Sequence, residues 1–430
     1  MRRFRFEDPG FSAAFSAFVA ERRETPEEVD AVVRDVLAAV RAEGLPALLR
    51  FAKEFDRVEL TETTIRLSAE EIAEGAAACP AKVRQAIAFA AARIRAYHQR
   101  QAPADQKFTD EAGVELGWRW TALESVGVYV PGGRAAYPST VLMNAVPAQV
   151  AGVGRIAMVT PPGRLQPAVL AAAQEAGITE IWRVGGAQAV AALAYGAGPL
   201  KPVDKIVGPG NAFVTAAKRR VYGVVGIDAL AGPSEIVVVA DGRNDPDWIA
   251  ADLLSQAEHD PAAQSILITD DADFAARVEA AVESQLKTLA TGEDAAASWR
   301  DHGAVVIAPL AESPALVDEI APEHVEFAVD DPEALADRVR HAGAIFLGRY
   351  TPEAVGDYVA GSNHVLPTSR AARFSSGLSI YDFIKRTSIV KCDAAAFAAL
   401  GPATVALAEA EGLPAHARSA AIRLNSGSWS

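Results

Sequence analysis

Four histidines of this chain stand near a carboxylate or an amide, and such groupings suit metal binding or acid–base chemistry. His259 follows Gln256 by three residues, at the end of a helical pattern that starts near Asp247 and stops at Pro261. Residues three apart share one face of a helix, so an imidazole and an amide would lie side by side. A surface histidine that complements the helix dipole would give the same pattern.

Three further pairs join a histidine to a carboxylate in turn-like sequence: Glu323 with His324, Asp357 with His364, and Glu411 with His416. An adjacent carboxylate and imidazole can divide acid–base work, because the imidazole exchanges protons near neutral pH while the carboxylate activates water. Each pair taken alone also fits a solvated surface. The four groupings together favour one convergent polar site, assembled from distant parts of the chain.

A metal at such a site would be bound through nitrogen and oxygen. Two histidines with Gln256 and Asp357 form a ligand set that suits Zn²⁺ or a similar divalent ion. The two cysteines, Cys79 and Cys392, have Ala-rich neighbours and no Cys-x-x-Cys motif, so we expect buried, reduced thiols in a cytoplasmic protein. The sequence has no serine-nucleophile elbow and neither cysteine has a histidine nearby, which disfavours a serine or thiol nucleophile.

The elements that hold these groups follow a regular plan from about residue 111. Strand-like runs are followed by glycine-rich turns and then by helical patterns, with the turns at Pro131–Gly133, Pro161–Gly163, Gly185–Gly186 and Gly208–Gly210. This alternation is typical of a parallel sheet covered by helices, in which ligands bind at the carboxyl ends of the strands. We therefore expect Tyr129, Gln188 and Asn211 to line one crevice.

This crevice has no standard dinucleotide fingerprint, because Phe213 stands where the third glycine of Gly-x-Gly-x-x-Gly would follow Gly208 and Gly210. Glycines in strand-end turns are common in α/β proteins, so the pattern alone leaves a nucleotide site open. A nucleotide crevice beside a metal and an acid–base pair would suit oxidation of an alcohol with a nicotinamide acceptor. A zinc-dependent binding or regulatory protein without turnover is the alternative from another class.

The predicted fold class is α/β, with two parallel-sheet, incomplete Rossmann-like domains, because 430 residues exceed one ordinary core. Four regions are expected: a helical region over residues 1–110 that packs on the second α/β domain, a first α/β domain for NAD over 111–233, a second α/β domain for the metal and the catalytic residues over 234–375, and a helical tail over 376–430.

The net charge and the length of the apolar runs argue against several classes of partner. The net charge of −14 argues against nucleic acid, because phosphate binding requires a basic surface. No apolar run reaches the ~20 residues of a transmembrane helix, so no membrane partner is expected. The N-terminus lacks the apolar segment of a signal peptide.

Eight motifs carry a family resemblance: Val130–Gly133, Val184–Ala189, Gly208–Thr215, Ala231–Glu235, Asp252–His259, Pro322–His324, Gly361–Thr368 and Phe374–Ser379. They resemble the motifs of histidinol dehydrogenase, and the resemblance runs from about residue 20 to about residue 425. Several of them are eight residues long, so chance agreement is negligible. The resemblance implies an NAD-dependent, zinc-requiring, four-electron oxidation of L-histidinol to L-histidine through L-histidinaldehyde, the last steps of histidine biosynthesis.

The resemblance also implies roles for individual residues. The implied zinc ligands are Gln256, His259, Asp357 and His416. The implied catalytic pair is His324, which takes the hydroxyl proton, and Glu323, which activates water on the aldehyde. The implied NAD contacts are Tyr129, Gln188 and Asn211. The implied substrate contacts are Ser234, Gln256, His259, His324, Asp357, Glu411 and His416.

A homodimer with shared active sites is implied as well, in which the C-terminal tail crosses to the partner. Glu411 and His416 would then complete the site of the other subunit. The nearest alternative is a zinc- and NAD-dependent relative of the same fold that oxidises another small alcohol, such as dihydroxypropanesulfonate. The motifs Asn363–Thr368 and Arg373–Ser379 favour histidinol as the substrate.

Overall fold

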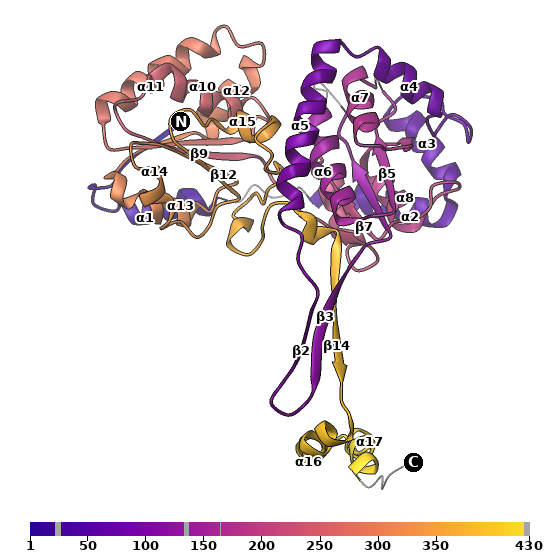
Figure 1. Ribbon diagram of the computed structural model, residues 1–430. Coiled ribbons are helices and arrows are strands. Elements are labelled where there is room, and N and C mark those ends of the chain that lie inside the picture. The colour runs from indigo at the N-terminus through magenta and orange to yellow at the C-terminus, as the bar shows by residue number, and fades with distance from the viewer. Residues whose placement is uncertain (22–26, 133–136, 164, 425–430) are drawn as a thin grey trace. The chain divides into compact units, whose positions relative to one another are not determined.

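The computed structural model describes residues 1–21, 27–132, 137–163 and 165–424 (Figure 1). The chain forms two compact units. The larger unit comprises Met1–Gln101 with Leu123–Phe383, and the smaller unit comprises Ala102–Ala122 with Ile384–Ser430. Gly133, which we expected in the turn after the first strand of the crevice, lies outside the described residues.

The first α/β half of the larger unit is built on a five-stranded parallel sheet with the order β6-β5-β4-β7-β8. Its strands are β4 (Ser125–Tyr129), β5 (Arg155–Thr160), β6 (Glu180–Arg183), β7 (Lys205–Val207) and β8 (Gly226–Ile227). Its helices are α2 (Glu27–Glu43), α3 (Leu45–Phe55), α4 (Ala69–Ala77), α5 (Ala81–Gln99), α6 (Pro138–Ala151), α7 (Pro167–Glu175), α8 (Gly186–Tyr195) and α9 (Ala212–Val221). Separate hydrophobic clusters lie on the two faces of the sheet, which explains the nearly continuous apolar strands.

The second α/β half is built on a six-stranded parallel sheet with the order β1-β11-β10-β9-β12-β13. Its strands are β1 (Arg2–Arg5), β9 (Glu235–Ala240), β10 (Gln264–Thr269), β11 (Ala304–Ile307), β12 (His324–Ala328) and β13 (Ala344–Leu347). Its α-helices are α1 (Phe11–Ala20), α10 (Pro246–Ala257), α11 (Ala272–Leu286), α12 (Gly292–His302), α13 (Ser313–Ile320), α14 (Pro332–Ala336) and α15 (Glu353–Tyr358). Short 3₁₀ turns occur at η1 (Leu310–Glu312), η2 (Ala371–Arg373) and η3 (Ile380–Asp382). The two sheets confirm the prediction of a mixed α/β fold with parallel strands.

The N-terminal region differs from the prediction, which placed residues 1–110 as helices on the second α/β domain. Among the described residues of this region, β1 and α1 belong to the second half, where β1 pairs with β11 and Phe15 and Phe18 enter the core. Helices α2 to α5 pack on the first half instead, with α2 against α8 and α9, α4 against α7, and α5 against α6. An amphipathic pattern shows that a helix has a buried face, but it does not identify the sheet that covers it.

The smaller unit also differs from the predicted helical tail, because it contains a three-stranded antiparallel sheet. This sheet joins β2 (Gln106–Thr109), β3 (Glu115–Ala122) and β14 (Ile384–Lys391). Helices α16 (Ala394–Ala410) and α17 (Pro414–Leu424) follow and pack on each other. β14 escaped sequence reasoning because its partner strand lies more than 250 residues earlier in the chain. None of the described helices combines the length and the apolarity that crossing a bilayer requires.

Candidate active site

The second α/β half brings four of the expected site residues together. Helix α10 ends one residue after Gln256, and β12 begins at His324, directly after Glu323. Helix α15 carries Asp357. In the sheet register, His324 pairs with the second residue of β9, so the site lies at the amino ends of the central strands. The carboxyl-end rule therefore does not describe the position of this cluster in the second half.

His324 is enclosed by carboxylates. Its Nδ1 lies 3.2 Å from Glu353 Oε1 and 3.7 Å from Glu323 Oε2, and 3.1 Å from the carbonyl oxygen of Glu235. Its Nε2 lies 3.6 Å from Asp357 Oδ1, which is an ion-pair distance too long for a hydrogen bond. Nε2 is buried and has no hydrogen-bond partner in the described part of the chain.

The burial of these groups shifts their protonation. Burial opposes the charging of His324, but the charges of Glu353 and Glu323 outweigh it and raise the pKa of the imidazole well above its usual value. Burial raises the pKa of Glu323 to about 7 and that of Glu353 to about 8. Burial acts in the same direction on Asp357, but contact with His324 holds the pKa of that carboxyl below its usual value. Titratable groups poised near neutral pH are typical of acid–base sites.

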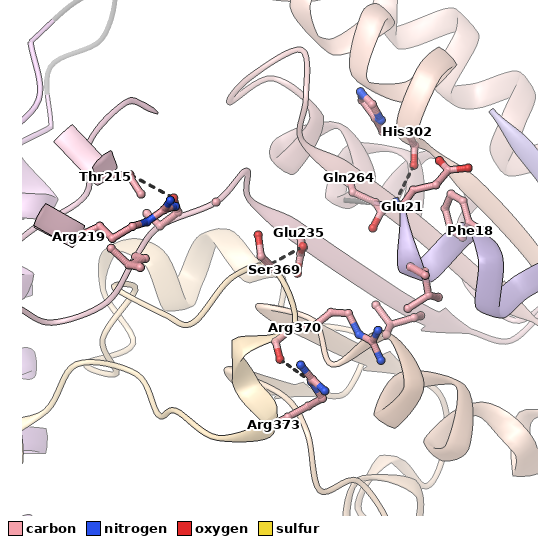
Figure 2. A pocket seen from close by; sticks show the side chains of 16 residues that line it. Phe18, Glu21, Thr215, Arg219, Glu235, Gln264, His302, Ser369, Arg370 and Arg373 are labelled. Atoms are coloured by element: carbon pink, nitrogen blue, oxygen red, sulfur yellow. Dashed lines mark hydrogen bonds between the residues drawn. The ribbon is translucent and has the colours of Figure 1, made fainter. Parts of the chain in front are cut away.

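Glu323 is also held by the start of β9, because the backbone N–H of Glu235 donates to Glu323 Oε2 at 3.1 Å. Ser234 directly precedes this contact. Glu235 borders a cavity of about 830 Å³ that is also lined by Arg219, Arg370 and Arg373. Figure 2 shows Glu235 and Ser369 facing each other there, where the Ser369 N–H donates to Glu235 Oε1 at 3.2 Å. Glu235 thus connects the Glu323 carboxylate to a partly basic cavity.

The site has donors that fit a divalent cation. One atom each from His324, Glu353 and Asp357 lie within 4.8 Å of one another. Gln256 is fully buried. Its amide nitrogen faces Glu353 and donates to Oε1 at 2.6 Å, because the opposite orientation would set the amide oxygen against the carboxylate oxygens, which are also acceptors. The amide oxygen is then left for a metal. These nitrogen and oxygen donors, without sulfur, suit Zn²⁺ in a site that keeps an open position.

The other expected metal ligands are His259 and His416, and Glu411 is a further expected substrate contact. His259 is exposed but close enough to Asp357 to contribute to the lowering of its pKa. Glu411 and His416 belong to the smaller unit, where both side chains are exposed. His364 accompanies Asp357, as its Nδ1 lies 3.0 Å from the Asp357 carbonyl oxygen.

The three expected NAD contacts lie at the carboxyl edge of the first sheet. Tyr129 ends β4, and its hydroxyl accepts a hydrogen bond from the Gly186 N–H at 3.0 Å. Asn211 caps α9 by accepting from two backbone N–H groups. Gly208 has a φ of +113°, and a Cβ there would lie 2.2 Å from the Tyr129 carbonyl oxygen. Tyr129 and Gln188 are buried, whereas Asn211 is exposed.

Sequence reasoning missed three buried carboxyl groups of the site, those of Glu235, Glu326 and Glu353. Glu326 interrupts the apolar strand β12, and a charge in such a strand is a signal that could have been used. Glu353 precedes Asp357 by four residues, which places both on one face of α15. Of the cysteines, Cys79 is buried as expected, but Cys392 is exposed because it directly follows the edge strand β14.

Comparison with known proteins agrees with this arrangement. Residues 19–424 match the family model of histidinol dehydrogenase. The histidinol dehydrogenase of Caulobacter vibrioides is 81% identical over 427 residues, covering 99% of this chain and 100% of the relative. That of Rhodospirillum rubrum is 61% identical and covers 97% of each chain. The crystal structure of histidinol dehydrogenase from Elizabethkingia anophelis superposes with a TM-score of 0.93 at 36% identity, covering 99% of this chain and 98% of that one. The chain therefore belongs to the histidinol dehydrogenase family and is an oxidoreductase.

Proposed function

We propose that this enzyme oxidises L-histidinol to L-histidine through L-histidinaldehyde, with NAD as the acceptor and zinc in the site. The observation that carries the proposal is the buried Glu323–His324 pair, which lies beside Gln256 and Asp357 at the amino ends of the central strands. Family membership supports the reaction and a place in histidine biosynthesis. The cytoplasm is the compartment that we propose.

The zinc ligands of the proposal are Gln256, His259 and Asp357, together with the partner subunit's His416. Zinc, when bound, supplies a positive charge that orients the imidazole and amine of the substrate and offsets the carboxylate charge around His324. The protein residues that contact the substrate would be Ser234, Gln256, His259, His324 and Asp357, with the partner subunit's Glu411 and the partner subunit's His416. We assign the metal and the chemistry to residues 234–375.

His324 acts as the base for the alcohol. Its Nδ1 faces two acceptors, the Glu353 carboxylate and the Glu235 carbonyl, so the proton is held at Nδ1. Nε2 is then the atom that takes the hydroxyl proton of the alcohol. Burial of the imidazole excludes water from this transfer.

Glu323 acts in the second oxidation. Its carboxylate takes a proton from water as that water attacks the aldehyde carbon, and a pKa of about 7 suits a base at neutral pH. Bound NAD would supply the hydride acceptor for each oxidation, so one histidinol would consume two NAD. We assign its contacts to Tyr129, Gln188 and Asn211, in the domain over residues 111–233.

A homodimer with shared sites is part of the proposal. The smaller unit leaves large apolar side chains exposed on its two helices and their connection: Leu400, Leu407, Leu413 and Ile422. Exposed apolar residues gathered on one small unit favour burial against another chain. The same helices carry His416, and Glu411 directly follows α16, so docking on the partner would deliver both to its site.

The alternative substrate, a sulfonated diol such as dihydroxypropanesulfonate, is not favoured, because the close relatives carry the name histidinol dehydrogenase. An NADH assay on purified protein tests the proposal. L-Histidinol should give two NADH per molecule, activity should fall after chelation and return with zinc, and the sulfonated diol should give none. NADH formation that survives complete removal of the metal would contradict the zinc requirement.

A further inference from the structure

Glu353 contacts both Gln256, which we expect to bind the metal, and His324, which we expect to move a proton. Its side chain is 2% exposed. One carboxylate oxygen lies 3.2 Å from His324 Nδ1, and both oxygens lie within hydrogen-bond distance of the Gln256 amide nitrogen. We propose that Glu353 is a positioning residue that fixes the Gln256 amide for the metal and the His324 imidazole for the substrate. The inference rests on the proposed zinc-dependent function.

The Gln256 contact decides which amide atom faces the metal. A glutamine can bind a cation only through its oxygen, since its NH₂ group is a donor without a lone pair to share. Glu353 accepts from that NH₂ group at 2.6 and 3.2 Å, through Oε1 and Oε2. The amide oxygen therefore has to point away from Glu353. Because Gln256 is fully buried, no water can compete for the NH₂ group and release this orientation.

The His324 contact decides which ring nitrogen is free. The Glu353 carboxylate and the Glu235 carbonyl are both acceptors at Nδ1, so they hold a proton on that atom. The lone pair of the neutral ring is then at Nε2, which is buried and has no hydrogen-bond partner in the described part of the chain. Carboxylates that orient histidines or other ligands in this manner commonly change metal affinity or activity 10- to 100-fold when they are removed.

Glu353 is itself held in place. It is the first residue of α15, and its backbone N–H donates to Glu326 Oε1 on β12. Asp357 follows one turn later on the same helix face. One short helix thus supplies an expected metal ligand and the carboxylate that orients a second one, while β12 supplies both the catalytic imidazole and the anchor of that carboxylate.

Glu353 could instead bind the metal directly, since one of its oxygens lies within ligand distance of His324 and Asp357. Its contacts argue against this. Both carboxylate oxygens face the Gln256 amide and one also faces His324, so a metal would have to displace these partners. The positioning role and the ligand role predict different effects of substitution.

The first test measures zinc affinity by competition with a coloured chelator, in the intact full-length protein. Glu353→Gln should weaken zinc binding about 10- to 100-fold, because a carboxamide at 353 replaces one of the two acceptor oxygens with an NH₂ group that faces the Gln256 NH₂ group. Glu180→Gln, at a carboxylate paired with Arg155 in the first half, is the matched control and should leave zinc affinity unchanged. An unchanged affinity in Glu353→Gln would overturn the inference, and a loss as complete as that of Asp357→Asn would make Glu353 a ligand.

The second test exchanges the two side chains. Gln256→Glu alone sets two carboxylates together, whereas the double variant Gln256→Glu/Glu353→Gln restores one carboxylate and one amide. Zinc affinity of the double variant should exceed that of Glu353→Gln by about tenfold, a coupling that independent sites do not show. Additive losses would sink the proposal. If Glu353→Gln fails to fold, Glu353→Asp is the second variant, because it keeps the carboxylate but shortens the side chain by one methylene. It should lower kcat and leave KM for histidinol little changed.

These outcomes separate the inference from the function on which it rests. Wild-type protein that binds no zinc and makes no NADH from histidinol contradicts the proposed function itself. If the wild-type protein binds zinc and makes NADH from histidinol, and Glu353→Gln behaves in the same way, only the positioning role is contradicted. Circular dichroism of each variant shows whether a loss of zinc affinity comes from a loss of fold.

Discussion

Lys218 and Asp228 form a buried ion pair that holds Gly208 at both of its backbone polar groups. Their side chains are 3% and 5% exposed. Lys218 Nζ donates to the Gly208 carbonyl oxygen at 2.9 Å, and Asp228 Oδ2 accepts from the Gly208 N–H at 2.7 Å. Gly208 begins the turn that leads to Asn211, so this pair fixes one wall of the expected cofactor crevice.

Removing one member of the pair should be costly. Lys218→Met leaves the Asp228 carboxylate buried without its counter-ion, and the free energy of unfolding should fall by about 3 to 5 kcal/mol. Urea unfolding followed by circular dichroism measures this change. Arg300→Met, at the exposed pair with Asp301, is the control and should have no measurable effect. Equal effects of the two substitutions would contradict a stabilising role of the buried pair.

The local signals in the sequence were enough to predict the parallel sheets. Buried strands such as β9 read as uninterrupted apolar runs, and glycine-rich turns marked the ends of strands in the first half. The predicted residues Gln256, Glu323, His324 and Asp357 do lie in one place. What the pattern could not supply was pairing over long distances in the chain. β1 joins β11 and β14 joins β3, and neither of these edge strands has a continuous apolar run of its own.

The buried carboxyl groups were missed for a related reason. A glutamate in the sequence looks the same whether it is solvated or enclosed, and only the fold shows that Glu326 and Glu353 are enclosed. The NAD contacts came from the family resemblance rather than from geometry. Tyr129 and Gln188 are buried in this structure, so their role stays a prediction.

The pair Asp252 and Glu326 should make stability depend on pH. Burial raises the pKa of Asp252 to about 6 from a usual value of 3.8, and burial together with Asp252 raises that of Glu326 well above its usual value. Between about pH 4 and 6 the folded protein holds a proton that the unfolded chain has lost. Stability should therefore fall as pH rises through this window, by at most about 3 kcal/mol for the Asp252 shift.

Asp252→Asn should reduce this dependence, because an amide stays neutral and its oxygen can still accept a hydrogen bond from the protonated Glu326. Urea unfolding of chelator-treated protein at about pH 4 and about pH 6 measures the difference between the two conditions. The variant should lose less stability than wild type between these two pH values. Glu283→Gln, on the exposed face of α11, should keep the wild-type dependence. A variant as pH-sensitive as wild type would exclude Asp252 as the source.

Glu323→Gln should separate the two oxidations. The amide cannot take a proton from water, so the aldehyde step should slow by about 100-fold or more, while His324 still serves the alcohol step. Stopped-flow traces on histidinol should show the first NADH formed quickly and the second slowly. Glu333→Gln, on the exposed side of α14, should leave both phases unchanged. Equal slowing of the two phases would remove Glu323 from the water-activating role.

Mixing two inactive variants should restore activity if subunits share their sites. His416→Ala lacks the ligand that we assign to the partner's zinc, and Glu323→Ala lacks the base of its own site. A heterodimer then has one intact site, made from Glu323 of one subunit and the partner subunit's His416, and one site with both changes. Because half of the dimers in an equal mixture are heterodimers, activity should reach about a quarter of the wild-type value.

The measurement is NADH formation after subunit exchange, with exchange verified by two differently tagged chains. Two copies of the same variant carried through the same exchange are the control and should stay inactive. Total zinc content should not change on exchange, because the sites of Glu323→Ala homodimers already have all four proposed ligands, so only the activity should rise. Verified heterodimers without activity would contradict site sharing. They would require that His416 serve its own chain or that it bind no metal.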